Sequence, residues 1–316
     1  MDRKQIYNMM YDNIKSGKIP ASRVLLIIMN NIGEETAVDV LQDTLGFISR
    51  AVLNSFLHSE AVERRTEELY NIVMDIMTSG RFNEFPSAME ALVSSAIGFS
   101  TSKQQHLKLM NWFESGLITE PNGRAIAGTS INVKVRHTMI RKIFGSIHLP
   151  KDKKKACFAK LAQLDKTDMI GRTQKFCEAA SPEPDAKEEA FREIFDNKEI
   201  GLQHLQELCR GWRQSSQKDL IETFAERFFE KIEECVNTRA WSNTRYIYIF
   251  LVPTMKANDQ ELARLNALKN RLEGYTEDQK QEGTNRLLKW LKESIQDVEE
   301  KKASQAFSRE WENSQQ

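Results

Sequence analysis

The sequence contains few residues that interrupt regular structure. Its 14 glycines and 7 prolines make up about 7% of the 316 residues, against about 12% in average proteins. An all-β fold needs many tight turns, and these two residues favour such turns, so their scarcity argues against that class. Good helix formers such as Glu, Lys, Leu, Ala, Gln and Met are common instead and favour an all-α protein.

An excess of one charge is also missing, because 45 basic residues balance 45 acidic ones. Nucleic-acid-binding proteins normally carry a basic excess, so we expect no nucleic-acid partner. One short basic cluster lies at an expected helix start, and we interpret it as a solvated helix face: Lys151, Lys153, Lys154 and Lys155.

Long apolar runs are absent. The longest, at residues 24–29 and 246–252, fall well short of the roughly 20 residues that span a bilayer. Residues 1–16 mix polar and apolar types and lack a signal-peptide pattern. We therefore expect the chain as given to be soluble, and its cellular compartment stays open.

The sequence also lacks the common signatures of catalysis and metal binding. No HExxH zinc motif, GxSxG elbow, phosphate-binding loop or GxGxxG fingerprint occurs. The cysteines match no zinc-ligand spacing, and we expect buried free thiols at Cys157, Cys177, Cys209 and Cys235. The histidines are too far apart for a helical zinc pair, and we expect surface or packed rings at His58, His106, His137, His148 and His204. We therefore predict no catalytic residue, no metal ligand and no cofactor in this chain.

Apolar residues recur every three or four positions over most of the chain, which predicts amphipathic helices. Ser102 with Gln105, and Thr276 with Gln279, have the spacing of capping boxes. Residues 131–135 alternate as in a strand, although helical spacing continues after them. The main expected helices cover residues 2–16, 21–30, 37–56, 87–97, 102–115, 130–144, 217–236, 239–252, 260–272 and 277–298.

Helices of about 10–20 residues joined by short connections predict antiparallel hairpins of the HEAT or armadillo type. No strict consensus repeats, so we predict an all-α superhelix of irregular pairs with a concave face. We expect one helical-repeat domain over residues 1–316, with a polar tail at 301–316 that is helical or frayed.

A series of short motifs follows in the second half of the chain: Lys187-Glu-Glu-Ala-Phe191, Gly211-Trp212, Glu226-Arg227-Phe228-Phe229, Thr238-Arg239 and Phe250-Leu251-Val252-Pro253. This series resembles the C-terminal helical domain of aminopeptidase N-type (gluzincin) zinc metallopeptidases, most clearly over residues 111–268. Trp212 stands where the family more often has Phe, and Val252 where it more often has an aromatic residue.

The resemblance implies a non-catalytic domain that caps the catalytic domain of an aminopeptidase and shapes peptide access to its cavity. In that family the zinc lies in the catalytic domain, which carries the HExxH and GxMEN motifs, and the enzyme removes N-terminal amino acids from peptides. The expected partners are therefore that catalytic domain and a peptide substrate. A surface exposed by separation from it would favour self-association.

Two alternatives stay open at this point. The chain would also fit a free-standing helical scaffold that binds a protein or peptide in its concave face. A helical hydrolase with an unrecognised site is the third reading. Three long cations near the best-matched motifs are candidates for contact with a peptide carboxylate: Arg213, Arg239 and Arg245.

Overall fold

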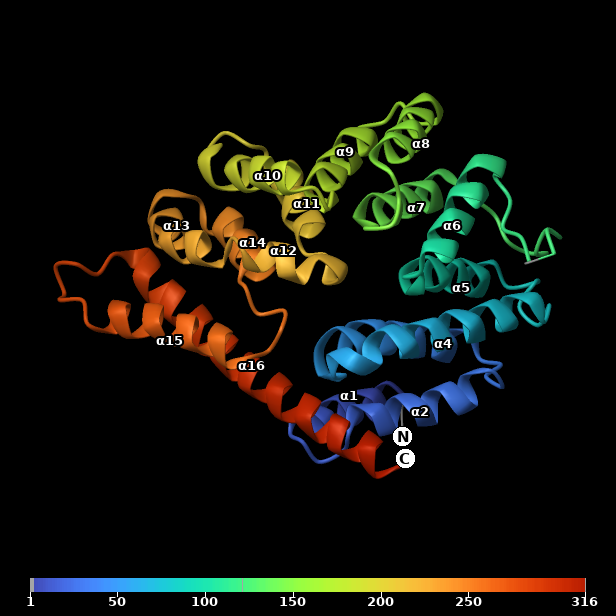
Figure 1. The fold of residues 1–316 in the computed structure, drawn as a ribbon, viewed down its shortest axis with the longest axis horizontal. Helices are drawn as coiled ribbons and strands as arrows, with labels where there is room; N and C mark the ends of the chain where they lie inside the picture. Colours follow the sequence, from blue (N-terminus) through green and yellow to red (C-terminus); the bar gives the residue numbers. More distant parts are fainter. Residues whose placement is uncertain (1–2, 121, 316) are drawn as a thin grey trace. The chain divides into compact units, whose positions relative to one another are not determined.

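The computed structural model describes residues 3–120 and 122–315, and these residues form helices joined by loops (Figure 1). No strand occurs within these ranges, and the one isolated β-bridge pairs Thr119 with Ala125. The predicted all-α class is therefore confirmed. None of the helices described is long and apolar enough to cross a membrane.

The chain divides into two compact units. Unit 1 comprises Met1–Ile143, His148–Ala159 and Glu300–Gln316, and unit 2 comprises Phe144–Ile147 and Lys160–Glu299. We predicted one helical-repeat domain over residues 1–316 and a superhelical arrangement of its helices. Both stay predictions.

Unit 1 is built on the first half of the chain. Within it, α4 packs against α5, and α3 packs against α5 as well. Its elements are α1 (Arg3–Lys15), α2 (Ala21–Ile32), α3 (Val38–Phe47), the π-helix η1 (Ile48–Phe56), α4 (Ser59–Thr78), α5 (Pro86–Phe99), α6 (Lys103–Ser115), and most of α7 (Val133–Gly145) and α8 (Lys151–Leu164).

Unit 2 holds the helices that carry most of the motif series. Within it α11 packs against both α9 and α14, and α10 packs against α9. Its elements are α9 (Met169–Ala180), α10 (Pro184–Asp196), α11 (Leu202–Trp212), the 3₁₀ turn η2 (Ser215–Gln217), α12 (Lys218–Glu222), α13 (Ala225–Thr238), α14 (Trp241–Leu251), α15 (Asp259–Glu273) and the first half of α16 (Glu282–Ser314).

Several helix boundaries follow from local chemistry. Ser102 accepts a hydrogen bond from the Gln105 amide and Gln105 reaches back to the Ser102 amide, so the predicted capping box is confirmed. Pro184 occupies the first position of α10, where a missing amide hydrogen costs nothing. Gly116 ends α6 in the left-handed conformation, with φ of 75°.

The single helix predicted over residues 217–236 is wrong. The chain leaves the helix between Glu222 and Ala225, where Phe224 takes φ of −96° and ψ of 0°. The ring of Phe224 packs against Trp212 with a centroid distance of 5.0 Å. Tertiary packing of this ring outweighs the helical periodicity of the sequence.

Other boundaries also differ from the sequence-based expectation. The helix expected over residues 37–56 changes into the π-helix η1 at Ile48. Residues 277–279 form a turn, in which the Gln279 side chain accepts from the Thr276 amide, and α16 begins only at Glu282. Residues 133–135 belong to α7, so the alternating pattern there does not mark a strand.

The C-terminal half of α16 is the segment that we expected to be a polar tail, and it packs into unit 1. Gln305 donates to the Ser55 carbonyl oxygen at 3.0 Å, and the Ser308 hydroxyl accepts from the Ala21 amide at 2.9 Å. Ser308 thus caps α2, whose preceding Pro20 has no side-chain hydrogen-bonding group. Gln305, Ser308 and Glu312 recur at helical spacing, and we call them the α16 contact face.

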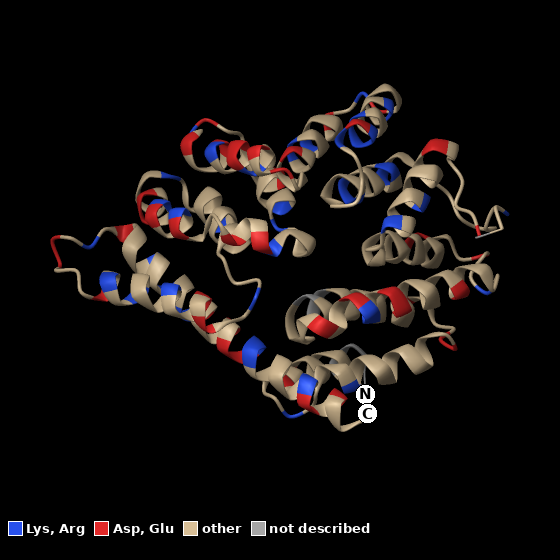
Figure 2. Cartoon of the chain, in the orientation of Figure 1, with Lys and Arg blue, Asp and Glu red and all other residues tan. Residues whose placement is uncertain are grey.

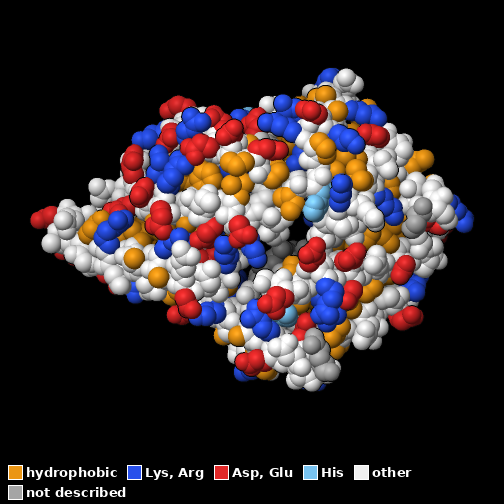
Figure 3. All heavy atoms as spheres, viewed as in Figure 1, with side chains coloured by type: hydrophobic (Ala, Val, Ile, Leu, Met, Phe, Trp, Pro, Cys, Tyr) orange, Lys and Arg blue, Asp and Glu red, His pale blue; other side chains and the backbone are white. Residues whose placement is uncertain are grey.

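Acidic and basic side chains are interspersed along the helices (Figures 2 and 3). In the basic cluster at the start of α8, Lys151, Lys153 and Lys155 are exposed, but Lys154 is only 1% exposed. The predicted solvated face is therefore wrong for Lys154. Helical spacing aligns Lys154 with the buried Cys157, so Lys154 lies on the inward face of α8.

Candidate functional site

The motif series centres on a buried lysine in unit 2. The Lys187 side chain on α10 is fully buried, and its Nζ donates to the carbonyl oxygens of Ala179 at 2.6 Å and Trp212 at 3.2 Å. Ala179 is the next-to-last residue of α9, and Trp212 is the last residue of α11. One side-chain amino group therefore donates hydrogen bonds to the C-terminal ends of two helices, where carbonyl oxygens lack intrahelical donors.

Two further residues, Gln217 and Gly211, lie at this contact. We call the four residues Lys187, Gly211, Trp212 and Gln217 the α9–α11 joint. The Gln217 amide donates to the carbonyls of Gly145 at 3.0 Å and Ala180 at 2.9 Å. A Cβ atom at Gly211 would lie 2.2 Å from the Phe176 carbonyl oxygen. Glycine therefore lets the backbones of α9 and α11 approach closely.

Aromatic rings and one ion pair surround the joint. Phe191 lies 5.7 Å from Trp212 and 5.3 Å from Phe224 between ring centroids. The Arg227 guanidinium stacks over Phe191 at 4.6 Å and donates to both carboxylate oxygens of Glu188, at 2.6 and 2.9 Å. The hydrogen bonds from Arg227, together with its charge, lower the pKa of Glu188 below its usual value. The motif residues thus fix the packing of α9–α13.

The sequence reasoning missed the role of Lys187. Lys187 shares one helix face with the buried Phe191 and Ile194, at spacings of four and seven residues. A lysine on an apolar stripe is the signal that marks a buried, hydrogen-bonded cation.

Lys187→Met should lower the free energy of unfolding by roughly 2 to 3 kcal/mol, because the Ala179 carbonyl oxygen loses its donor and the Trp212 carbonyl oxygen keeps only the Gln214 amide. Burial lowers the pKa of Lys187 from 10.5 to about 7. Between about pH 7 and pH 10.5, the Lys187 side chain therefore binds more protons in the unfolded chain than in the folded chain. Its contribution makes the free energy of unfolding rise with pH over this range. Urea unfolding at pH 7 and pH 9.5 should show this rise in the wild type relative to Lys187→Met. Lys153→Met, at an exposed position, is the control. If the difference in unfolding free energy between the wild type and Lys187→Met did not change with pH, Lys187 would not have a lowered pKa.

Two of the predicted arginines contact other residues of unit 2. Arg239 donates to the Phe195 carbonyl oxygen at 2.7 Å, at the C-terminal end of α10. Arg245 is exposed on α14, with its guanidinium 5.1 Å from the centre of the Trp241 ring. Arg239 thus stabilises a helix end, and Arg245 covers an exposed aromatic ring.

Arg213 differs from both. It follows Trp212 directly at the end of α11, and its side chain is partly buried. Its electrostatic neighbours are Asp297 on α16 and Glu261 on α15. The three arginines therefore have separate surroundings in unit 2, and their contact with a substrate stays a prediction.

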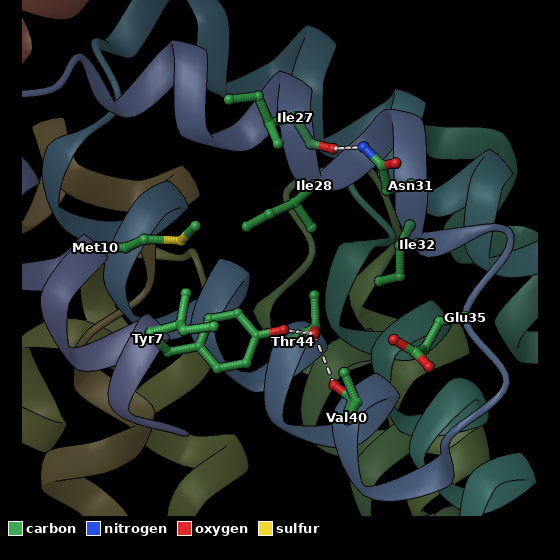
Figure 4. A pocket seen from close by; sticks show the side chains of 10 residues that line it. Tyr7, Met10, Ile27, Ile28, Asn31, Ile32, Glu35, Val40 and Thr44 are labelled. Carbon is green, nitrogen blue, oxygen red and sulfur yellow. Dashed lines mark hydrogen bonds between the residues drawn. The ribbon is translucent and has the colours of Figure 1, made fainter. Parts of the chain in front are cut away.

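Unit 1 contains an apolar pocket between α1, α2 and α3, with a volume of about 270 Å³ (Figure 4). The Tyr7 and Thr44 hydroxyls are hydrogen-bonded to each other, and Thr44 donates to the Val40 carbonyl oxygen at 2.6 Å. Glu35 accepts from the amides of Thr36 and Ala37. The pocket is lined by Ile6, Tyr7, Met10, Ile27, Ile28, Asn31, Ile32, Glu35, Val40 and Thr44.

These polar groups bond to the chain itself, and the lining contains no histidine, cysteine or lysine. In Figure 4, Met10 and Ile28 point into the space between the helices. The pocket therefore offers mainly apolar contact to a small group, and its polar side chains Tyr7, Thr44 and Glu35 are hydrogen-bonded within the chain.

The cysteines and histidines hold no metal-binding arrangement in the part of the chain that the structure describes. All four cysteines are buried free thiols, as the sequence predicts. Burial raises the pKa of Cys235 to about 11, which makes it a poor nucleophile at neutral pH. His58, His106 and His137 are buried, whereas His148 and His204 are exposed.

Comparison with known proteins gives one informative similarity. No protein-family model matches the chain. Aminopeptidase N of Streptomyces lividans is 20% identical over 262 residues, which cover 81% of this chain and 28% of that protein. The chain thus resembles part of an aminopeptidase and spans about a quarter of the length of the relative that it matches.

Proposed function

We propose that this chain is a non-catalytic helical domain of a larger zinc aminopeptidase, where it packs on the catalytic domain and shapes peptide access. The similarity to Aminopeptidase N carries this proposal, because it covers 81% of the chain and only 28% of the relative. Such a proportion is what one domain of a longer enzyme would give. The proposed partners are the catalytic domain and the peptide substrate.

The joint of unit 2 fits this role. A domain that limits access to a cavity must hold its helices rigidly, because small shifts would change the opening. Lys187 donates to the ends of both α9 and α11, and Gln217 donates to the end of α9. Gly211, near the end of α11, allows close backbone contact with α9. The zinc and the hydrolytic residues would belong to the catalytic domain, since this sequence has no HExxH motif.

Activity measurements on the chain alone test the first half of the proposal. The purified chain, supplied with zinc, should not hydrolyse leucine p-nitroanilide, whereas a full-length aminopeptidase should. Turnover that co-purifies with this chain and withstands a metal chelator would overturn the proposal.

Association and selectivity test the second half. The chain should bind the separately produced catalytic part of its enzyme, and adding it should change the ratio of kcat/KM for a dipeptide and a decapeptide by about tenfold. Absence of association, with peptide binding retained by the chain alone, would favour the free-standing scaffold.

A further inference from the structure

The two halves of α16 pack by different kinds of contact. The half that belongs to unit 2 buries three apolar side chains completely in the hydrophobic core: Leu287, Leu291 and Val298. Within residues 300–315, which belong to unit 1, the buried side chains are all polar: Ser304, Ser308 and Glu312. Burial of apolar surface is the main driving force of packing, and the second half of α16 has little of it.

The polar contacts under the second half of α16 are incomplete. Gln305 and Ser308 form hydrogen bonds with the backbone of η1 and α2. However, Ser304 Oγ, Glu312 Oε1 and Arg65 Nε are buried and form no hydrogen bond with another described residue. A buried polar group without a hydrogen bond costs free energy, and a partly satisfied network is held weakly. This contact should therefore open before the rest of unit 1 unfolds.

The Glu312 carboxylate lies in a site lined by basic groups of α4 and its N-cap. Oε2 is 2.9 Å from Arg64 Nη2 and 3.4 Å from His58 Nε2, and Oε1 is 3.5 Å from Arg65 Nη2. Arg65 also pairs with Glu68 of its own helix at 2.8 Å, whereas Glu312 is 248 residues away from Arg64 along the chain. The basic groups share one short segment, so they would stay together if α16 withdrew. Guanidinium groups arranged in this way favour a carboxylate.

We propose that residues 300–315 form a releasable latch, and that the face of unit 1 beneath the latch is a docking site for an acidic helix. The occupant presents a glutamate to Arg64 and Arg65, and a small hydroxyl side chain one turn earlier to the Ala21 amide. In the closed state Glu312 and Ser308 of the chain itself supply these two groups. In the open state a partner helix of the same chemistry takes their place. This inference goes beyond the proposed function and does not depend on it.

The experiment measures binding of a fluorescein-labelled peptide of residues 299–315 to the full chain by fluorescence anisotropy. The wild type should bind the peptide weakly, because its own tethered segment competes at a high effective concentration. Full-length Glu312→Gln holds its latch less firmly but keeps Arg64 and Arg65, so it should bind the peptide about tenfold more tightly. Ser308→Ala, which removes the cap of α2, should also bind more tightly and replaces Glu312→Gln if that variant does not fold.

Three controls assign the effect to the carboxylate site. A peptide that itself carries Glu312→Gln should bind the Glu312→Gln chain about tenfold more weakly than the unaltered peptide. Adding Arg64→Gln, at a half-exposed side chain, to that chain should weaken its binding of the unaltered peptide. Glu310→Gln, at an exposed position of α16, should bind the peptide as weakly as the wild type.

Hydrogen exchange of the wild type gives an independent measure of release. The amides of residues 301–310 should exchange roughly a hundredfold faster than those of residues 288–298, although both stretches belong to one helix. Equal exchange of the two stretches would show that the latch does not open. Equal peptide binding by the wild type and both latch variants, or equal binding of the two peptides, would also overturn the proposal.

Discussion

Replacing Gly211 with alanine should destabilise unit 2 by roughly 3 kcal/mol, at the upper end of the cost of overpacking. The new Cβ would lie 2.2 Å from the Phe176 carbonyl oxygen and 3.0 Å from its carbon. Both atoms belong to the backbone of α9, so no side-chain rotation can relieve the contact. The helices must separate, and the bonds from Lys187 to Ala179 and Trp212 must stretch. Chemical denaturation followed by helical circular dichroism measures the loss.

Helix propensity alone predicts the opposite sign, because alanine in a helix interior is about 1 kcal/mol more favourable than glycine. Gly98 provides the matched control, since it lies within α5 and a Cβ atom there meets nothing within 4 Å. Gly98→Ala should leave stability unchanged or raise it by up to about 1 kcal/mol. Equal stability of Gly211→Ala and the wild type would show that α9 and α11 do not approach as described.

Replacing Glu312 with glutamine should destabilise unit 1 by roughly 3 kcal/mol, the usual cost of removing one partner of a buried ion pair. Glu312 Oε2 lies 2.9 Å from Arg64 Nη2 and 3.4 Å from His58 Nε2, and Oε1 lies 3.5 Å from Arg65 Nη2. The Arg65 and His58 side chains are almost fully buried, and glutamine removes the negative charge that faces the Arg65 guanidinium. The α16 contact face should then detach more readily, which hydrogen exchange of residues 300–314 would report.

The effect of Glu312 should depend on pH. Burial alone would raise its pKa, but hydrogen bonding and the charges of Arg65 and His58 outweigh burial and hold the pKa below its usual value of 4.5. Its stabilising contribution is therefore complete above pH 4.5 and is lost as the pH falls through the lowered pKa. The difference between wild type and Glu312→Gln should shrink between pH 5 and pH 3. Glu310→Gln, at an exposed position of the same helix, should show neither effect.

Much of the helical structure could be predicted from the sequence, because its causes are local. The capping box of Ser102 and Gln105 needs only four residues in order, and the apolar periodicity of α13 marks its buried face. The break before α13 could not be predicted, because it depends on Phe224 packing against Trp212.

The candidate site was harder to predict. The sequence singled out Arg213, Arg239 and Arg245 as cations of the right type, but residue type does not give surroundings. Arg239 donates to a helix end, Arg245 lies over a ring, and Arg213 has Asp297 and Glu261 as its electrostatic neighbours. The neighbours of Arg239 and Arg213 lie more than 40 residues away along the chain, whereas Arg245 meets a ring on its own helix.

The sequence by itself determined the all-α class, the free buried thiols and the resemblance to an aminopeptidase domain, since composition, periodicity and short motifs are properties of neighbouring residues. Only the tertiary structure decided that Lys187 and Lys154 are buried, that Gly211 is a point of backbone contact, and that the polar C-terminal segment packs through Glu312 into unit 1. The physical reason is that burial and hydrogen-bond partners come from elements distant in the chain, and these overrule the solvent preference of an isolated lysine or glutamate.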